Sequence, residues 1–172
     1  MTRPPAGLSA LHPAWLLATW FGAGLVPKAP GTLASFVALP FAWFIQTWFG
    51  APGLLAAGVA AFCVGCWACG PLLTGAAHED PSHIVIDEVA GQWLTLAMVA
   101  FAAEAPEPLF YATGFILFRA FDIMKPWPIS WSERRFSGAL GIMIDDVLAA
   151  VFAGAGTVFI FAFAHHLGPF SS

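Results

Sequence analysis

Five carboxylates lie at the ends of apolar segments, a place where ionisable side chains are costly and usually functional. They form three clusters that lie far apart in the sequence: Asp87-Glu88, Asp122 and Asp145-Asp146. Packed together without a cation, these acids would repel one another, and some would take up protons. A divalent metal would resolve this conflict. Because the acids supply only oxygen ligands, we predict Mg²⁺, Mn²⁺ or Ca²⁺ rather than zinc, held as one ion or as two.

Two basic side chains accompany the middle acid. Arg119, Asp122 and Lys125 follow one another at intervals of three and therefore share one side of a helix. Arg and Lys beside metal-binding acids form an anion cradle, in which Arg can hold a phosphate through two parallel hydrogen bonds. The alternative interpretation is a local ion pair with interfacial anchoring, which is stronger for Lys125 than for Arg119.

The turn over residues 27–35 is a further candidate for anion binding. Its Pro-Gly step breaks the chain, and Thr32 is expected to cap the helix that follows. The free N–H groups and positive dipole end of that helix would favour a phosphate, with Lys28, Thr32 and Ser35 as candidate substrate contacts. Taken alone, this turn is explained more simply by helix capping.

Small residues follow two of the acidic clusters. Gly91 comes one turn after Asp87, and the Ala149-Ala150 pair follows the last two aspartates. Such residues allow helices to approach closely and would bring the carboxylates within ligating distance. The three cysteines lie within one apolar segment without a fourth ligand, so they are predicted to pack as small hydrophobic residues.

The composition is that of an integral membrane protein. Hydrophobic residues make up 59% of the 172 residues and charged residues 9%, against roughly 45–50% and 25% in soluble domains. The mean hydropathy is +0.80. The length predicts a single domain over residues 1–172. A net charge of −4 without a basic run argues against a nucleic-acid partner.

The apolar segments predict an all-α bundle with about four to five spans, each needing about 20 residues to cross a bilayer. The segment Trp15–Val26 is too short to cross and is expected to form an interfacial or re-entrant helix. The spans are expected at Thr32–Phe49, Gly53–Ala77, Ile84–Ala103, Leu109–Met124 and Ile142–His165.

The basic residues predict the orientation of these spans. If the spans alternate in direction, every Lys and Arg falls on one side of the membrane, and the opposite loops have none: Arg3, Lys28, Arg119, Lys125, Arg134 and Arg135. By the positive-inside rule this side is cytoplasmic. The same alternation brings the three acidic clusters and the turn at 27–35 to that face at similar depth. We therefore predict one site, facing the cytoplasm.

These residues leave two classes of protein open, a membrane enzyme and an ion carrier. A small cation or proton carrier that used the acidic cluster as its ion site would also need polar groups at the midplane or along a path to the far face. The far halves of the expected spans are nearly free of ionisable groups. This favours an enzyme without identifying its reaction.

Four segments resemble the signature blocks of the phosphatidylglycerophosphatase A family. They are PKAPGTLAS (27–35), DPSHIVIDEVAG (80–91), FRAFDIMKPWPI (118–129) and GIMIDDVLAAV (141–151). The combined pattern of D-E-x-x-G, F-D-x-x-K-P-x-P and G-I-M-x-D-D, in this order, is specific, whereas any one block alone is weak. The chain departs from the family pattern at Ser137-Gly138-Ala139 and at Ala149-Ala150, where the residues remain small.

The resemblance implies a Mg²⁺-dependent hydrolase of the bacterial inner membrane. It would remove the terminal phosphate of phosphatidylglycerophosphate to give phosphatidylglycerol in phospholipid biosynthesis. By matching motif, the expected metal-binding and catalytic acids are Asp87, Glu88, Asp122, Asp145 and Asp146. Arg119 and Lys125 would contact the phosphate. Either Glu88 or Asp146 would orient or deprotonate the attacking water. The oligomeric state is not predicted.

Overall fold

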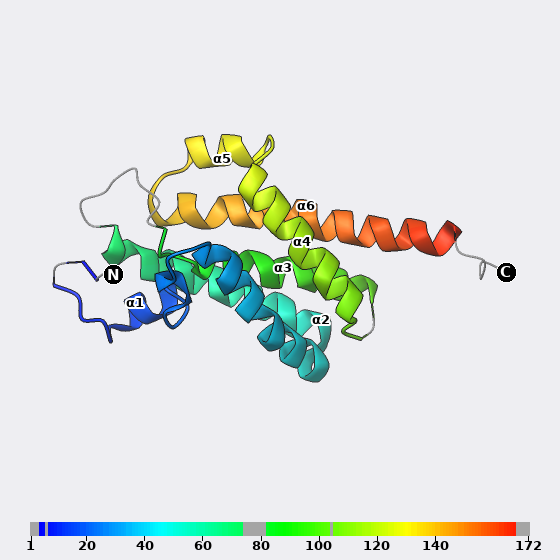
Figure 1. The fold of residues 1–172 in the computed structure, drawn as a ribbon, viewed down its shortest axis with the longest axis horizontal. Helices are drawn as coiled ribbons and strands as arrows, with labels where there is room; N and C mark the ends of the chain where they lie inside the picture. The colour runs from blue at the N-terminus through cyan, green and yellow to red at the C-terminus, as the bar shows by residue number, and fades with distance from the viewer. Residues whose placement is uncertain (1–3, 6, 74–81, 104, 168–172) are drawn as a thin grey trace.

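The computed structural model describes residues 4–5, 7–73, 82–103 and 105–167, and within them every regular element is a helix (Figure 1). The elements are α1 (Pro13–Ala18), the 3₁₀-helix η1 (Ala23–Leu25), α2 (Pro30–Leu72), α3 (Ile86–Ala102), α4 (Pro108–Met124), α5 (Ile129–Arg135) and α6 (Gly138–Leu167). The prediction of an all-α fold is confirmed for this part of the chain.

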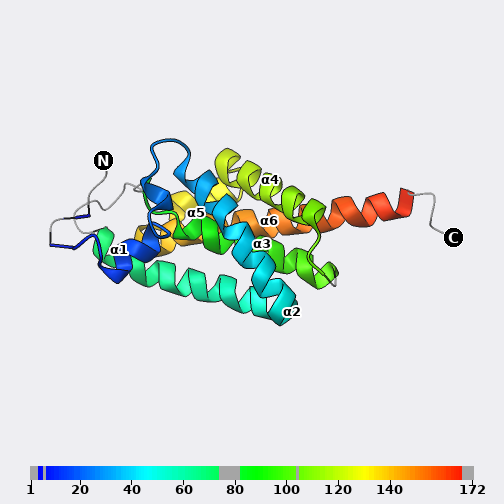
Figure 2. The same cartoon turned by 60° about the horizontal axis from the view of Figure 1, so that its bottom comes forward.

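The element α2 contains the first two predicted spans and is broken at Gly50. This residue has φ 65° and ψ −168°, a conformation that glycine adopts far more readily than other residues. Figures 1 and 2 show the two halves of α2 turned back on each other at this point as a helical hairpin. Both ends of α2 therefore lie toward the same end of the molecule. The predicted residues 74–77 of the second span lie outside the described residues.

The element α3 is the central helix, buried along most of its length and packed mainly against α2 and α6. Glycines allow the close approach. A Cβ at Gly65 of α2 would overlap the Met143 sulfur of α6, and one at Gly58 would lie 2.9 Å from Leu94 of α3. A Cβ at Gly91 would lie 2.5 Å from the Phe118 ring of α4 and 3.1 Å from the Asp146 carbonyl oxygen. The predicted role of Gly91 in close helix packing is confirmed.

In the described part of the chain, two elements are long and apolar enough to cross a membrane, Pro30–Leu72 and residues 138–164 of α6. Large apolar side chains such as Phe159 and Phe163 are exposed on α6, whose C-terminal part projects beyond the other helices in both views (Figures 1 and 2). The elements α3 and α4 have 17 residues each, which is at the lower limit of about 17 for a crossing. These two helices, together with the apolar composition, favour a helical membrane protein.

The predicted N-terminal helix over Trp15–Val26 is wrong in its extent. Only the short α1 and the single turn η1 are helical there, because Trp20 (φ 47°), Phe21 (φ 54°) and Gly22 (φ 98°) take left-handed conformations that end the helix. The buried Trp15 and the rest of α1 pack against α2.

Two further boundaries differ from the prediction. Thr32 is not the N-cap of α2, because Pro30 already occupies the first turn with Ala29 as the cap residue. Proline at this position has a φ value preset for a helix and loses no hydrogen bond. The polar loop expected after Pro128 instead contains α5, whose last turn carries Arg134 and Arg135, favourable at the negative end of a helix dipole.

The packing at Gly91 predicts the effect of adding one methyl group. Gly91→Ala should destabilise the protein by about 1–3 kcal/mol, because the Phe118 ring and the α6 backbone leave no space for it. Gly70→Ala is the matched control, since no heavy atom lies within 4 Å of the position that its Cβ would take; it should be neutral or stabilising by about 0.5–1 kcal/mol. Thermal unfolding in detergent micelles measures both, and equal melting temperatures would contradict the packing described here.

Candidate active site

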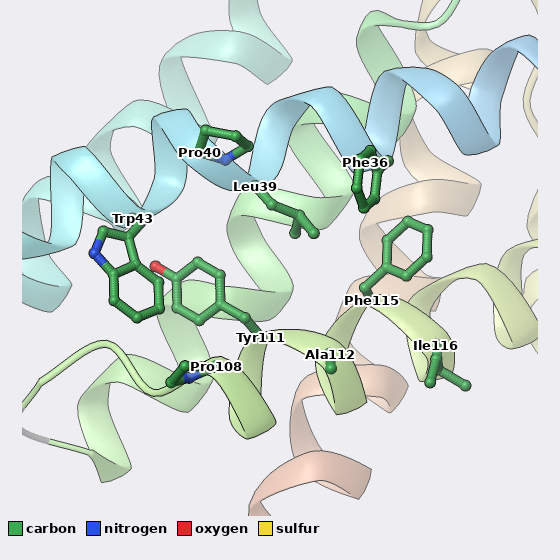
Figure 3. Close-up of a pocket in the computed structure, with 9 residues that line it drawn as sticks. All are labelled: Phe36, Leu39, Pro40, Trp43, Pro108, Tyr111, Ala112, Phe115 and Ile116. Carbon is green, nitrogen blue, oxygen red and sulfur yellow. The ribbon is translucent and has the colours of Figure 1, made fainter.

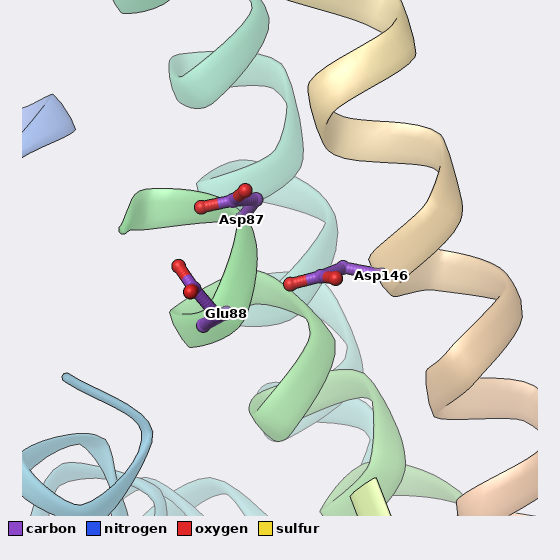
Figure 4. A group of neighbouring side chains, drawn as sticks. All are labelled: Asp87, Glu88 and Asp146. Carbon is purple, nitrogen blue, oxygen red and sulfur yellow. The ribbon is translucent and has the colours of Figure 1, made fainter. Parts of the chain in front are cut away.

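Three acids from two helices meet at one point. Asp87 and Glu88 lie in the first turn of α3, and Asp146 reaches them from α6, with the three side chains directed toward one another (Figure 4). One oxygen of each lies within 4.8 Å of the others. Asp87 is 6% exposed and Asp146 3%. The positive end of the α3 dipole favours carboxylates in its first turn, but it does not balance three of them.

This acidic trio has oxygens that the protein itself does not satisfy. Among the described residues, Glu88 Oε2 and Asp146 Oδ2 are buried without a hydrogen-bond partner. A buried carboxylate oxygen in that state is costly unless a cation or a proton compensates it. An all-oxygen set of carboxylates suits a hard divalent cation, so the residues present fit the magnesium predicted from the sequence.

Arg119 of α4 joins the trio to the rest of the predicted site. Its Nη1 lies 2.6 Å from Asp122 Oδ2 and 3.8 Å from Glu88 Oε1, and it donates a hydrogen bond of 3.4 Å to the Ser35 hydroxyl. The charge of Asp122 acts on both Glu88 and Asp146. Arg119 Nε is buried and has no hydrogen-bond partner in the described part of the chain. One donor of the guanidinium therefore remains available beside the acids.

The first turn of α2 forms the wall opposite α3. A Cβ on Gly31 would overlap Glu88 Oε1 and would lie 3.3 Å from Arg119 Nη2, so only glycine fits here without displacing the acid. Ser35 is buried, and its hydroxyl donates to the Gly31 carbonyl oxygen at 2.9 Å while accepting from Arg119. Ser35 thus lies at the site, as predicted.

The other two residues predicted from this turn are not brought into the cluster. Lys28 is exposed and makes no ion pair with any described residue. Thr32 is partly buried inside the first turn of α2, and none of the side-chain hydrogen bonds found among the described residues joins it to an acid.

Asp145 faces a different partner from its neighbour Asp146. Its Oδ2 accepts a hydrogen bond of 2.7 Å from Lys125 Nζ, which also donates to Glu133 Oε1 of α5 at 2.8 Å. Burial lowers the pKa of Lys125, but the hydrogen bonds to Asp145 and Glu133 raise it by more, so its pKa is raised above the usual value. Lys125 therefore stays charged at neutral pH, and the stability that its charge contributes is lost as the pH rises into the alkaline range.

Sequence reasoning missed Glu133. The residue belongs to the S-E-R-R run within the predicted loop, and only the folding of α5 against α6 places its carboxylate beside Lys125. The pattern of acidic residues at the ends of apolar segments could not find it, because Glu133 lies in a polar stretch.

Known proteins resemble the chain over most of its length. The model of the Phosphatidylglycerophosphatase A family matches residues 16–161. Phosphatidylglycerophosphatase A of Escherichia coli (strain K12) is 36% identical over 159 residues, covering 92% of this chain and 88% of the relative. The protein of the same name from Haemophilus influenzae is 34% identical over 151 residues, covering 88% of this chain and 90% of the relative.

A third relative carries a different name. A Bacteroides thetaiotaomicron protein named "Putative phosphatidylinositol-3-phosphatase" is 37% identical over 143 residues, covering 80% of this chain and 87% of that protein. None of the solved structures matches the chain. All three relatives are named as lipid phosphatases, which supports an enzyme rather than an ion carrier.

The family match extends from α1 into α6 and includes all four segments that carry the resemblance. The residues that meet at the acidic trio, at Arg119 and at the Lys125 ion pairs all lie within it. The chain belongs to the phosphatidylglycerophosphatase A family.

Proposed function

We propose that the protein hydrolyses phosphatidylglycerophosphate to phosphatidylglycerol and inorganic phosphate. Water would supply the oxygen that bonds to phosphorus as the bond to the glycerol oxygen breaks, and one proton would pass to that oxygen. The observation that carries the proposal is the meeting of the acidic trio with Arg119, where unsatisfied carboxylate oxygens and an unsatisfied guanidinium N–H lie together. The names of the two relatives with the highest coverage support the substrate.

Asp87, Glu88 and Asp146 are the residues proposed to hold Mg²⁺. Bound there, the ion would neutralise charge on the phosphate and make a nearby water more acidic. The two unsatisfied oxygens of Glu88 and Asp146 support this assignment, because each needs a positive partner that the described residues do not supply.

Arg119 is proposed to bind the phosphoryl oxygens. Its free Nε–H would donate to an oxygen whose charge increases as the bond to the leaving group breaks. Asp122 and Ser35 hold the guanidinium in place from two other helix positions. Glu88, the member of the trio within 4 Å of that guanidinium, is proposed to accept the proton of the attacking water.

Lys125 and Asp145 are proposed to position the helices around the site rather than to take part in the hydrolysis itself. Their ion pair, extended to Glu133, ties the end of α4 and the short α5 to the start of α6. Lys125 already directs two of its three N–H donors to carboxylates of the protein, so its main partners are these acids. The Asp145 carboxylate also accepts a hydrogen bond of 3.1 Å from the Asp146 backbone N–H. This contact helps to fix the backbone of α6 next to the acidic trio.

We further propose that the chain crosses the bacterial inner membrane several times with the site facing the cytoplasm. Lys125, Arg134 and Arg135 lie at the C-terminal end of α4 or just after it, whereas Glu107 precedes its other end. A helix of 17 residues separates the two ends by about 25 Å. The basic end is the cytoplasmic one by the positive-inside rule.

Neutralising the trio should abolish turnover. Asp146→Asn and Glu88→Gln keep the side-chain size, and each should lower kcat for phosphate release at least about a hundredfold. The control is Glu107→Gln, an exposed acid at the opposite end of α4, which should retain the wild-type rate. Purified proteins with matched melting temperatures are compared, and a wild-type rate for Asp146→Asn would contradict its assignment.

Removing divalent metal should stop the reaction and lower stability. Chelation should abolish phosphate release, and Mg²⁺ should restore it. Mg²⁺ at about 100 times its Kd should also stabilise the folded protein by about 2.7 kcal/mol, seen as a higher melting temperature. Asp146→Asn should lose this shift. Full activity after exhaustive chelation would rule out the metal, and an equal shift in Asp146→Asn would place it elsewhere.

The orientation can be tested by labelling single cysteines with a membrane-impermeant reagent, after Cys63, Cys66 and Cys69 are replaced by alanine. Ser137→Cys, just after α5, should be labelled only when the cytoplasmic side is accessible, and Glu107→Cys only from the other side; both positions are exposed. Labelling of both from the same side would contradict the proposed topology.

A further inference from the structure

An apolar groove runs between the first half of α2 and α4 (Figure 3). Its volume is about 510 Å³. The α2 wall includes Phe36, Leu39 and Trp43, and the α4 wall includes Tyr111, Ala112 and Phe115. The lining is apolar apart from the Trp43 indole N–H and the Tyr111 hydroxyl, which already donates a hydrogen bond of 2.8 Å to Gln46 Oε1.

Both walls of this groove lead directly to the candidate active site. Phe36 follows Ser35 in the sequence, and Phe115 comes four residues, about one helical turn, before Arg119. The hydrogen bond from Arg119 to Ser35 joins the two walls at this end, and the Phe36 and Phe115 rings meet just below it with centroids 6.0 Å apart. A molecule held by Arg119 would therefore have the groove as an adjoining apolar surface.

The groove also extends far enough along α4 to hold much of a lipid tail. From Arg119 to Tyr111 the α4 axis extends about 12 Å, close to the roughly 15 Å of hydrocarbon in one leaflet. The groove opens to the lipid-facing surface, where Phe36 and Ile116 are 59% and 62% exposed. A second apolar cavity, lined by Val99, Phe110 and Val158 among others, lies at the opposite ends of α3 and α4 and has no such link to the acids.

We propose that one acyl chain of the lipid substrate lies in the groove between α2 and α4 while its phosphate contacts Arg119. This inference rests on the proposed function and extends it, because it assigns the recognition of the diacylglycerol part to a defined surface. The headgroup and the tail would then be bound by neighbouring residues of the same two helices, within about one helical turn of each other. The enzyme would select long-chain phosphate monoesters over water-soluble ones.

Filling the groove should weaken binding of long chains alone. Ala112 is exposed on the groove wall, so Ala112→Phe adds a ring there without entering the core. It should raise KM for dioleoyl phosphatidylglycerophosphate in mixed micelles about tenfold, the effect of withdrawing roughly two buried methylene groups. KM for the dihexanoyl substrate should stay within about twofold of wild type. The matched control is Ala60→Phe, an exposed alanine on the second half of α2 outside the groove.

Equal KM values of Ala112→Phe and Ala60→Phe for the dioleoyl substrate would overturn the proposal. So would an equal rise for both substrates, since this would place the effect at the headgroup. If the variants give either result while the wild-type protein releases phosphate, the proposed function still holds. Only the assignment of the groove to the acyl chain is then rejected.

Photo-crosslinking gives a readout that does not depend on turnover. Phosphatidylglycerophosphate with a diazirine at the middle of one acyl chain should label residues 36–43 and 111–116, and excess dioleoyl substrate should compete. Equal labelling of Phe159 and Phe163 on the exposed end of α6 would overturn the proposal, as would equal groove labelling by diazirine phosphatidylcholine. Specific groove labelling without any phosphate release would reject the proposed reaction but retain the lipid site. A groove covered by a second copy of the chain would remain unlabelled, which also overturns the proposal.

Discussion

The structure depends on how a set of acids is compensated inside an apolar helix bundle. Six carboxylates, including Glu133, gather around the start of α3, the end of α4 and the start of α6. The basic side chains Arg119 and Lys125 form ion pairs with four of them, Glu88, Asp122, Glu133 and Asp145. Four negative charges are left over if all six acids ionise. Burial makes such an excess unstable by itself. Protons or a bound cation must compensate this excess, and the cluster of Asp87, Glu88 and Asp146 could hold a metal ion.

Close packing of the helices makes this arrangement possible. The site needs side chains from four helix segments at one depth, and small residues remove the bulk that would keep those segments apart. Gly31 admits the Glu88 carboxylate, and Gly91 admits both the Phe118 ring and the α6 backbone beside Asp146. These glycines lower helix propensity, by roughly 1 kcal/mol relative to alanine at an interior position. The geometry of the site is thus obtained at the expense of local helix stability.

Much of this could be predicted from the sequence, because acids in apolar segments are rare and the segments are long. The helix over 109–124, the division of α2 near Gly50 and the meeting of Asp87, Glu88 and Asp146 all follow from hydrophobic pattern, turn residues and alternation. The different surroundings of Asp145 and Asp146 did not follow, since adjacent helix positions differ by about 100° and only packing decides which one faces inward.

Short elements were the least predictable. The seven residues of α5 and the six of α1 are too few to be stable as isolated helices, so their existence depends on contacts with α6 and α2. The role of Glu133 and the start of α2 at Pro30 were not predicted either. Each depends on local geometry, whereas the sequence analysis relied on repeating patterns of apolar residues.

The divided roles of Asp145 and Asp146 have a consequence for how the family can change over time. A single inserted or deleted residue in α6 before Asp145 would rotate both aspartates by about 100° and shift them by about 1.5 Å, so that neither would reach its present partner. Substitutions at exposed positions of α6, such as Phe159 and Phe163, carry no such effect. The length of α6 from Gly138 to Asp146 should therefore be fixed much more strictly than its composition.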